Sequence, residues 1–205
     1  MLLENYSTRG SMSFKQKIQE LKRELLLEEA TNLFIRDGYE NMKIAELAKN
    51  AKVSVGSIYA MFGSKEALYN NYLMGQIDYY MAIVEKEFEK YTNPKKMLII
   101  LTEIKFSAII KNRNAIKESF SDPTFFLNVS LDDDDPLMQM YTYIAEQVMK
   151  PLSQMMYIKK NPLEMFFIYD GITLGRLRYW LVAGGDLMSS VEETVDSFLA
   201  IIEKS

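Results

Sequence analysis

The chain has 205 residues, of which 48% are hydrophobic and 25% are charged, and its formal net charge is -4. This balance is typical of a folded globular protein with a full hydrophobic core and excludes a disordered chain. The sequence contains no cysteine and no histidine. Disulfides, thiolate or imidazole metal sites and catalytic triads that need these residues are therefore excluded. We expect a binding protein without cofactor or metal, not an enzyme.

Targeting and membrane signals are lacking. No segment reaches the roughly 18 consecutive apolar residues of a membrane span. Residues 1–12 contain Glu4 and Arg9 where a secretory signal would have a long apolar run. We therefore expect no membrane association and a cytoplasmic location, and we interpret residues 1–13 as a flexible arm.

Helical periodicity dominates the chain, whereas strand-like alternation is hard to find. The first predicted helix covers residues 14–37, and its inner side is expected to carry Ile18, Leu21 and Leu25, followed by Ala30, Leu33 and Phe34. Gly38 stands where a left-handed C-cap belongs, and Asn41 is expected to cap the second helix.

Two short helices follow. Ile44, Leu47 and Ala48 are expected to face inward from the second, and Ile58, Tyr59 and Phe62 are carried by the third. Ser54 is expected to cap the third helix, Gly63 to end it, and Ser64 to cap a long fourth helix that reaches about Lys90.

The remaining chain is predicted to form a larger helical bundle. Its expected helices cover residues 94–110, 112–120, 136–157, 162–183 and 190–202, separated mainly by Pro, Gly and Asn. The loop over residues 121–135 ends in four aspartates, which either stay solvated or bind a cation. The fold class is therefore all-α, with about nine helices in total.

The second and third helices have the length pattern of a helix-turn-helix, in which the later helix enters the DNA major groove. Ala48 is small where the two helices cross, and the exposed side of the third helix carries no acidic residue that would repel phosphate. Residues 1–70 hold 10 Lys and Arg against 9 Asp and Glu, whereas residues 71–205 hold 14 against 19. This split is expected if a DNA-binding end is joined to an acidic body. It is equally expected if the charges are solvated evenly over the surface.

The run from Asn41 to Leu68 resembles the N-terminal domain of the TetR family of bacterial transcriptional regulators. It carries Ile44-Ala45, Val53-Ser54-x-Gly56, Ile58-Tyr59 and Phe62-x-Ser64-Lys65-Glu66 in the family's spacing, and Ala30-x-x-Leu33-Phe34-x-x-x-Gly38-Tyr39 fits the family's first helix. The resemblance covers about residues 26–73. It implies a helix-turn-helix domain over residues 14–63 and a ligand-binding and dimerisation domain over residues 64–205.

The resemblance also implies a DNA-binding face. Its expected residues are Lys43, Ser54, Val55, Gly56, Ser57, Tyr59, Ala60 and Lys65. Tyr59 and Lys65 match family residues that contact the DNA backbone, and Lys65 lies at a helix N-terminus that favours phosphate. Lys52 replaces the usual turn glycine, so we expect a strained or differently wound backbone there. Arg9 in the arm either stays disordered or reaches a minor groove.

The C-terminal body is rich in methionine and aromatic residues, which either form ordinary core or line a pocket for a small hydrophobic effector. The candidate pocket residues are Phe106, Phe120, Met138, Tyr141, Phe167 and Asp170. By the resemblance, the last two helices form the homodimer interface, with candidate residues Ile172, Gly175, Leu177, Leu181, Val195, Phe198 and Ile202.

The favoured function is that of a sequence-specific transcriptional regulator that binds double-stranded operator DNA as a homodimer. The most direct version is a repressor that a small effector releases from DNA, although activation fits the same residues. One alternative is a helical-bundle enzyme or small-molecule binding protein without DNA affinity. Another is a DNA-binding protein with an architectural role.

Overall fold

The computed structural model describes residues 13–115 and 135–204. In these ranges it contains nine α-helices, one π-helical segment and one short 3-10 helix, and no strand. The predicted all-α class is confirmed. The chain divides into two compact units, residues 1–72 and 73–205. The N-terminal unit therefore extends past the end of the third helix and includes the first turns of the fourth.

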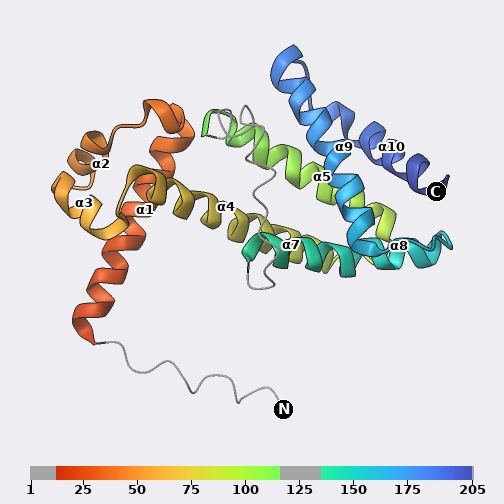
Figure 1. The fold of residues 1–205 in the computed structure, drawn as a ribbon, viewed down its shortest axis with the longest axis horizontal. Coiled ribbons are helices and arrows are strands. Elements are labelled where there is room, and N and C mark those ends of the chain that lie inside the picture. Colours follow the sequence, from red (N-terminus) through yellow and green to blue (C-terminus); the bar gives the residue numbers. More distant parts are fainter. Residues whose placement is uncertain (1–12, 116–134, 205) are drawn as a thin grey trace. The chain divides into compact units, whose positions relative to one another are not determined.

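The N-terminal unit consists of α1 (Phe14–Asn41), α2 (Ile44–Asn50), α3 (Val55–Phe62) and the first part of α4 (Lys65–Phe88) (Figure 1). Its core combines aliphatic and aromatic side chains. Phe34 is fully buried and packs against Tyr69 and Tyr72 of α4, with ring centroids 5.1 Å and 5.4 Å away. This aromatic cluster fixes α1 against α4 and so supports the two short helices between them.

The predicted helix boundaries agree with the structure at most positions in this unit. Gly63, with φ 84°, is the C-cap of α3, whereas Gly38, with φ 79°, lies at a kink inside α1 and does not end that helix as predicted. The Ser64 hydroxyl accepts a hydrogen bond from Ala67 N at 3.0 Å. The expectation for Asn41 is wrong, because α2 begins after Lys43 and the Asn41 amide donates instead to the Asp37 carbonyl.

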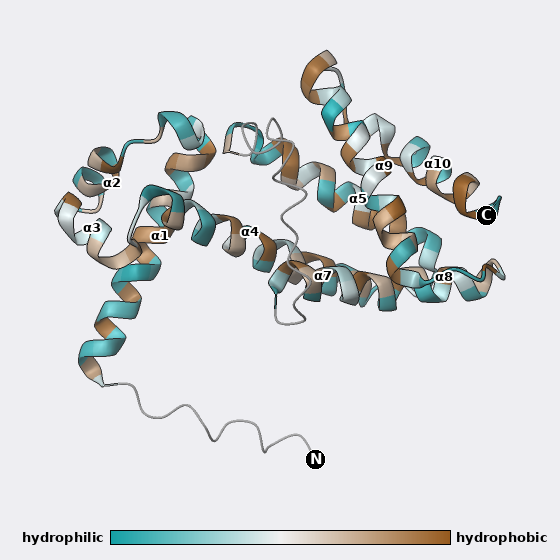
Figure 2. Ribbon diagram, viewed as in Figure 1, coloured by the Kyte–Doolittle hydropathy of each residue, from teal (hydrophilic) through white to brown (hydrophobic). Residues whose placement is uncertain are grey.

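The N-terminal half of α1 differs from its predicted packing. Ile18, Leu21 and Leu25 are 38%, 57% and 56% exposed, so they do not face the core. The α1 residues that enter the core lie further along, beginning with Leu26. Hydrophobic and hydrophilic residues alternate along this part of α1 in Figure 2. Periodicity located the helix and placed Ala30, Leu33 and Phe34 correctly in the core, but it assigned the wrong face to the core in the first half of the helix.

The C-terminal unit contains the rest of α4 and the helices α5 (Pro94–Lys111), α7 (Pro136–Ile144), α8 (Lys150–Met155), α9 (Pro162–Ala183) and α10 (Val191–Glu203), with the 3-10 helix η2 (Met188–Ser190). Its largest core cluster joins side chains of all five of these α-helices and of α4. A smaller cluster gathers around Phe106, Leu177 and Trp180.

A π-helical segment, η1 (Ala145–Met149), joins α7 to α8. The sequence predicted one continuous α-helix from Pro136 to Tyr157. Such segments insert an extra residue into a helical turn and shift the faces that follow. Asp135 begins this stretch by accepting hydrogen bonds from the backbone of Leu137 and Met138. The other three residues of the aspartate run lie outside the described residues.

None of the helices in the described ranges is long and apolar enough to span a membrane.

Candidate nucleic-acid interface

Helix α3 exposes one face and buries the other. Ile58 and Phe62 are 1% and 7% exposed and hold the helix against the core. The predicted DNA-binding residues of α3 all lie on the exposed side, namely Val55, Gly56, Ser57, Tyr59 and Ala60. None of the eight residues of α3 is charged. The structure therefore brings these five residues together on a surface that places no carboxylate against phosphate.

Two serines organise the start of α3. The Ser54 side chain accepts a hydrogen bond from Ser57 N at 3.1 Å, so Ser54 is the N-cap, as the sequence predicted. The two hydroxyls also share a hydrogen bond of 2.8 Å. Because each hydroxyl has further acceptor capacity, both can take part in an additional contact without losing the cap.

The turn between α2 and α3 depends on Lys52. This residue has φ 54°, a conformation that costs free energy for any residue with a Cβ atom. The prediction of a strained or differently wound backbone at this position is confirmed. The turn is closed by backbone hydrogen bonds from Ala51 N to the Leu47 carbonyl at 2.9 Å and from Val53 N to the Ala48 carbonyl at 3.0 Å.

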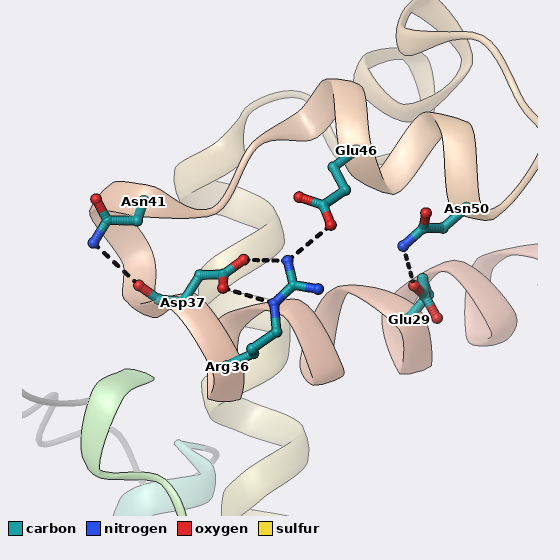
Figure 3. Close-up of polar contacts among 6 residues, drawn as sticks. All are labelled: Glu29, Arg36, Asp37, Asn41, Glu46 and Asn50. Atoms are coloured by element: carbon teal, nitrogen blue, oxygen red, sulfur yellow. Dashed lines mark hydrogen bonds and ion pairs between the residues drawn. The ribbon is translucent and has the colours of Figure 1, made fainter.

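Polar contacts attach α2 to α1 (Figure 3). Arg36 of α1 forms ion pairs with Asp37 at 2.5 Å and with Glu46 of α2 at 2.8 Å. Asn50, at the end of α2, donates to Glu29 of α1 at 2.7 Å. The Arg36 hydrogen bond lowers the pKa of Asp37 below its ordinary value. Both ends of α2 are therefore attached to α1. These contacts hold in place the helix that precedes α3.

The two predicted phosphate-binding lysines lie at helix N-termini. Lys43 is exposed and directly precedes α2. Lys65 is the first residue of α4, and its Nζ lies 3.2 Å from the Glu40 carbonyl oxygen and 4.8 Å from the centre of the Tyr39 ring. These contacts orient the Lys65 ammonium group, whose remaining donors can bind an anion.

A groove of about 980 Å³ lies beside α3. Ser57 and Ala60 line it, together with Lys22, Glu28 and Glu29 of α1 and Lys52 of the turn. Sequence reasoning assigned neither lysine to the interface. The positive φ of Lys52 marks a tight turn at this place, but the sequence alone does not show that the turn borders a groove.

The chemistry of this face is suited to binding. In the described ranges, no three Cys, His, Asp or Glu side chains form a group that could hold a metal ion. The predicted residues supply hydroxyls, small apolar contacts and ammonium groups, which are the groups that contact phosphates and base edges in DNA. The arrangement matches a recognition helix, α3, with two further phosphate contacts from Lys43 and Lys65.

The six candidate pocket residues do not form one site in the described structure. Phe106 belongs to the smaller core cluster, whereas Met138 and Tyr141 belong to the larger one. Phe167 is 43% exposed and its ring packs 5.4 Å from that of Tyr141. Phe120 lies outside the described residues. A groove of about 570 Å³ in this unit is lined by other residues, among them Glu85 and Tyr143.

Asp170 is the centre of a polar group inside the C-terminal unit. It forms an ion pair with Lys105 at 2.5 Å, and Lys105 also donates to the Thr173 hydroxyl at 2.6 Å. Nearby, Tyr169 shares a hydrogen bond of 2.9 Å with the Thr102 hydroxyl. Burial raises the pKa of Tyr169 well above its ordinary value, and Asp170 adds to the effect. Sequence reasoning found Asp170 but not its partner Lys105.

The predicted interface residues of α9 and α10 separate into two groups. Leu177, Val195, Phe198 and Ile202 are almost completely buried in the core of their own chain. A second chain cannot reach these four side chains without opening the core. The other three, Ile172, Gly175 and Leu181, are at least partly accessible.

Gly175 of the predicted interface lies on an accessible face of α9 that Val182, a residue not predicted, extends. Phe167, Gly171, Gly175 and Val182 recur at helical spacing, and Val182 is 91% exposed. A Cβ atom added at Gly171 or Gly175 would meet no atom within 4 Å.

Comparison with known proteins identifies the N-terminal unit. Residues 26–72 match the family described as bacterial regulatory proteins, tetR family. The HTH-type transcriptional regulator HbdR of Aromatoleum sp. (strain CIB) is 34% identical over 82 residues, which are 40% of this chain and 36% of that protein. The uncharacterized HTH-type transcriptional regulator YuxN of Bacillus subtilis (strain 168) is 38% identical over 74 residues, 36% of this chain and 23% of that protein. The matches thus span about a third or less of these relatives.

Similarity of the fold extends through both units. The structure of the transcriptional regulator FadR from Bacillus subtilis, solved in complex with stearoyl-CoA, superposes with a TM-score of 0.68. The superposition covers 88% of this chain and 98% of that one, at 16% sequence identity. At this identity, the comparison shows a shared all-helical fold.

Proposed function

We propose that this chain, whose residues 26–72 match the tetR family of bacterial regulatory proteins, is a sequence-specific, DNA-binding transcriptional repressor that acts in the cytoplasm. The observation that carries the proposal is the exposed face of α3, which is free of charged residues and begins at the Ser54 cap. Such a helix fits the major groove, where Ser57 can bond to either base edge and Val55 and Ala60 can contact thymine methyl groups.

DNA binding requires that two copies act together. A helix of eight residues reads only a few base pairs, and helix-turn-helix proteins therefore bind paired half-sites as dimers. In our proposal α9 and α10 form the homodimer, through the accessible face of α9 instead of the four buried side chains. Phosphate contacts by Lys43, Lys65 and Tyr59 supply the part of the affinity that does not depend on sequence.

We further propose that a small, largely hydrophobic effector binds in the C-terminal unit and releases the protein from DNA. The methionine and aromatic side chains of its core can adapt to an apolar ligand, and the Lys105–Asp170 pair offers a polar anchor. The fold of FadR, which resembles this one, was solved with stearoyl-CoA. Helix α4 is continuous and contributes residues to both units. Its displacement would change the separation of the recognition helices, which must match a half-site spacing of roughly 34–36 Å.

The first test is a mobility-shift assay of the full chain on its own upstream intergenic DNA at two salt concentrations. We expect a discrete complex that weakens as salt rises, because phosphate contacts release counterions. Lys65→Ala should lower the affinity about tenfold, or by about 1.4 kcal/mol, and should flatten the salt dependence by roughly one phosphate contact. Tyr59→Phe should weaken binding less, since the ring remains and only the hydroxyl is lost.

Two controls make the assay specific. Lys65→Met keeps an unbranched apolar stem that can pack on Tyr39 but removes the cation, so it should lose as much affinity as Lys65→Ala, which separates loss of charge from loss of packing. Lys159→Ala removes an exposed lysine of the C-terminal unit and should have no effect. If neither this DNA nor a selection from genomic fragments yields a salt-sensitive complex, the DNA-binding function is refuted and ligand binding becomes the leading function.

A further inference from the structure

The N-terminal half of α1 carries an exposed apolar stripe, the α1 stripe, which consists of Phe14, Ile18, Leu21 and Leu25. These side chains are 80%, 38%, 57% and 56% exposed. Leu26, the next residue, is only 4% exposed, so the stripe and the core lie on different sides of the helix. Leaving this much apolar surface in water is unfavourable, by about 25 cal/mol for each Å². A continuous exposed apolar surface of this kind marks an interaction site.

The spacing of the α1 stripe is that of a coiled coil. Its residues are separated by four, three and four positions, the alternation of the a and d positions of a heptad. Ile18 and Leu25 then occupy a positions, and Phe14 and Leu21 occupy d positions. The next residues in this register, Glu28 and Asn32, are polar. The stripe is thus limited to the first three turns of α1.

The charges around the α1 stripe indicate what covers it. Residues 14–29 contain four Lys and Arg and four Glu, so their net charge is zero (4 − 4). An anionic membrane surface or a nucleic acid would require a cationic helix face. A second α1 offers both an identical apolar stripe and the same mixture of charges. We therefore propose that the α1 stripes of two copies of this chain pair as a short antiparallel coiled coil.

The antiparallel direction follows from the residues that flank the stripe. Lys17 and Glu24 occupy g positions, which face each other in an antiparallel pair, so each Lys17 meets Glu24 of the other copy. In a parallel pair g positions face e positions, so Lys17 would meet Lys22 and Glu24 would meet Glu29. All four parallel contacts join like charges, whereas the antiparallel pair has two attractive contacts and two repulsive ones between Lys15 and Lys22. Charged pairs at these positions set the orientation of coiled coils.

The flanking side chains are available for these contacts. Lys17 and Glu24 are exposed, and neither forms an ion pair with another residue in the part of the chain that the structure describes. Three helical turns are too short to pair strongly alone. Pairing between separate molecules therefore depends on protein concentration.

The test compares the full chain with a Leu21→Lys variant by sedimentation velocity over a concentration series. The wild-type protein should contain a species with twice the mass of the largest species of Leu21→Lys. This comparison holds whether or not α9 forms a dimer, so it can fail independently of the proposed function. Glu20→Lys introduces the same side chain at an exposed position outside the stripe, and should retain the larger species.

The outcomes separate the possible reasons for the stripe. Equal masses for the wild-type protein and Leu21→Lys at every concentration overturn the proposal. An unchanged mass with a lower melting temperature also overturns it, since the stripe is then covered within its own chain. If Glu20→Lys loses the larger species as well, the association reflects overall charge and not the stripe, and the proposal is again overturned.

Charge reversal tests the direction of pairing. Lys17→Glu should weaken the association, because two Lys17–Glu24 contacts become repulsive, and adding Glu24→Lys in the same chain should restore it. A parallel coiled coil predicts the opposite for the single variant, because Glu at position 17 would then face Lys22. Strengthened association of Lys17→Glu would refute the antiparallel arrangement.

Discussion

At the scale of single residues, Gly56 is a position where DNA binding, and not the fold, explains the choice of glycine. It lies on the exposed face of α3, and a Cβ atom added there would meet only the Ser54 hydroxyl at 3.8 Å, an ordinary contact. Its backbone is not among those with positive φ. The protein's own fold therefore does not require glycine at this position, and a requirement from outside the chain remains: close approach of the helix to the DNA backbone.

This reasoning predicts that Gly56→Ala leaves the protein folded but weakens operator binding. The free energy of unfolding should stay the same or rise by up to about 1 kcal/mol, because alanine favours helix. DNA affinity should fall about tenfold. Gly75→Ala is the matched control, since a Cβ atom added at Gly75 of α4 would meet no atom within 4 Å, and this variant should retain full affinity. Full affinity of Gly56→Ala would show that α3 does not approach DNA at this residue.

Several residues of the helix-turn-helix could be predicted from the sequence because local chemistry determines them. Ser54 as a cap and Gly63 as a helix end depend only on neighbouring backbone groups. Lys52 was predicted by its departure from the family's glycine, and its φ of 54° bears this out. Asn41 could not be predicted, because its alternative partner, the Asp37 carbonyl, becomes available only when α1 continues past Gly38.

At the scale of elements, the crossing of α2 with its neighbours depends on Ala48. Ala48 is 5% exposed, and its carbonyl accepts the hydrogen bond from Val53 N that closes the turn. A larger side chain at this position has to displace one of the helices. The position of α3, and with it the recognition face, is therefore sensitive to the volume of residue 48.

We predict that Ala48→Leu lowers the free energy of unfolding of the N-terminal unit by about 1–3 kcal/mol, the usual cost of overpacking a core. DNA binding should weaken further than this stability loss explains, because α3 is displaced. Ala45→Leu is the control, since Ala45 is exposed on the same helix. Chemical denaturation and mobility shift would be measured on both. Equal stability of the two variants would contradict the packing assigned to α2.

The limits of prediction are different for whole helices. Periodicity found α1, but it placed Ile18, Leu21 and Leu25 inward, because an apolar stripe reads the same whether it meets its own core or a second chain. The π-helical segment η1 was also missed. Its residues, Ala145 to Met149, are ordinary in a helix, and the local signal lies just beyond them, because Pro151 cannot donate the helical hydrogen bond of that turn.

At the scale of the whole molecule, the same ambiguity affects the residues assigned to the proposed homodimer. Sequence analysis assigned Val195, Phe198 and Ile202 to the interface by resemblance, and the structure buries them in the core of one chain. Gly175 was assigned to the interface as well, and it does lie on an accessible face, together with Gly171. On α9, a glycine is thus a better sequence signal of an accessible helix face than a large apolar residue. A helix inside a core seldom leaves the space above a glycine unfilled.

The last prediction concerns that face of α9. Gly175→Glu should stabilise the isolated helix slightly, by up to about 1 kcal/mol, because no atom of the chain lies within 4 Å of the new Cβ. In a homodimer built on α9, the same side chain would meet its counterpart across the two-fold axis and place two carboxylates in a closely packed contact. We therefore expect Gly175→Glu to halve the mass of the dimer in light scattering and to lose operator affinity, since a single α3 reads too little DNA. Ala82→Glu, at an exposed position of α4, should keep both the mass and the affinity. An unchanged mass for Gly175→Glu would place the homodimer contact elsewhere on the C-terminal unit.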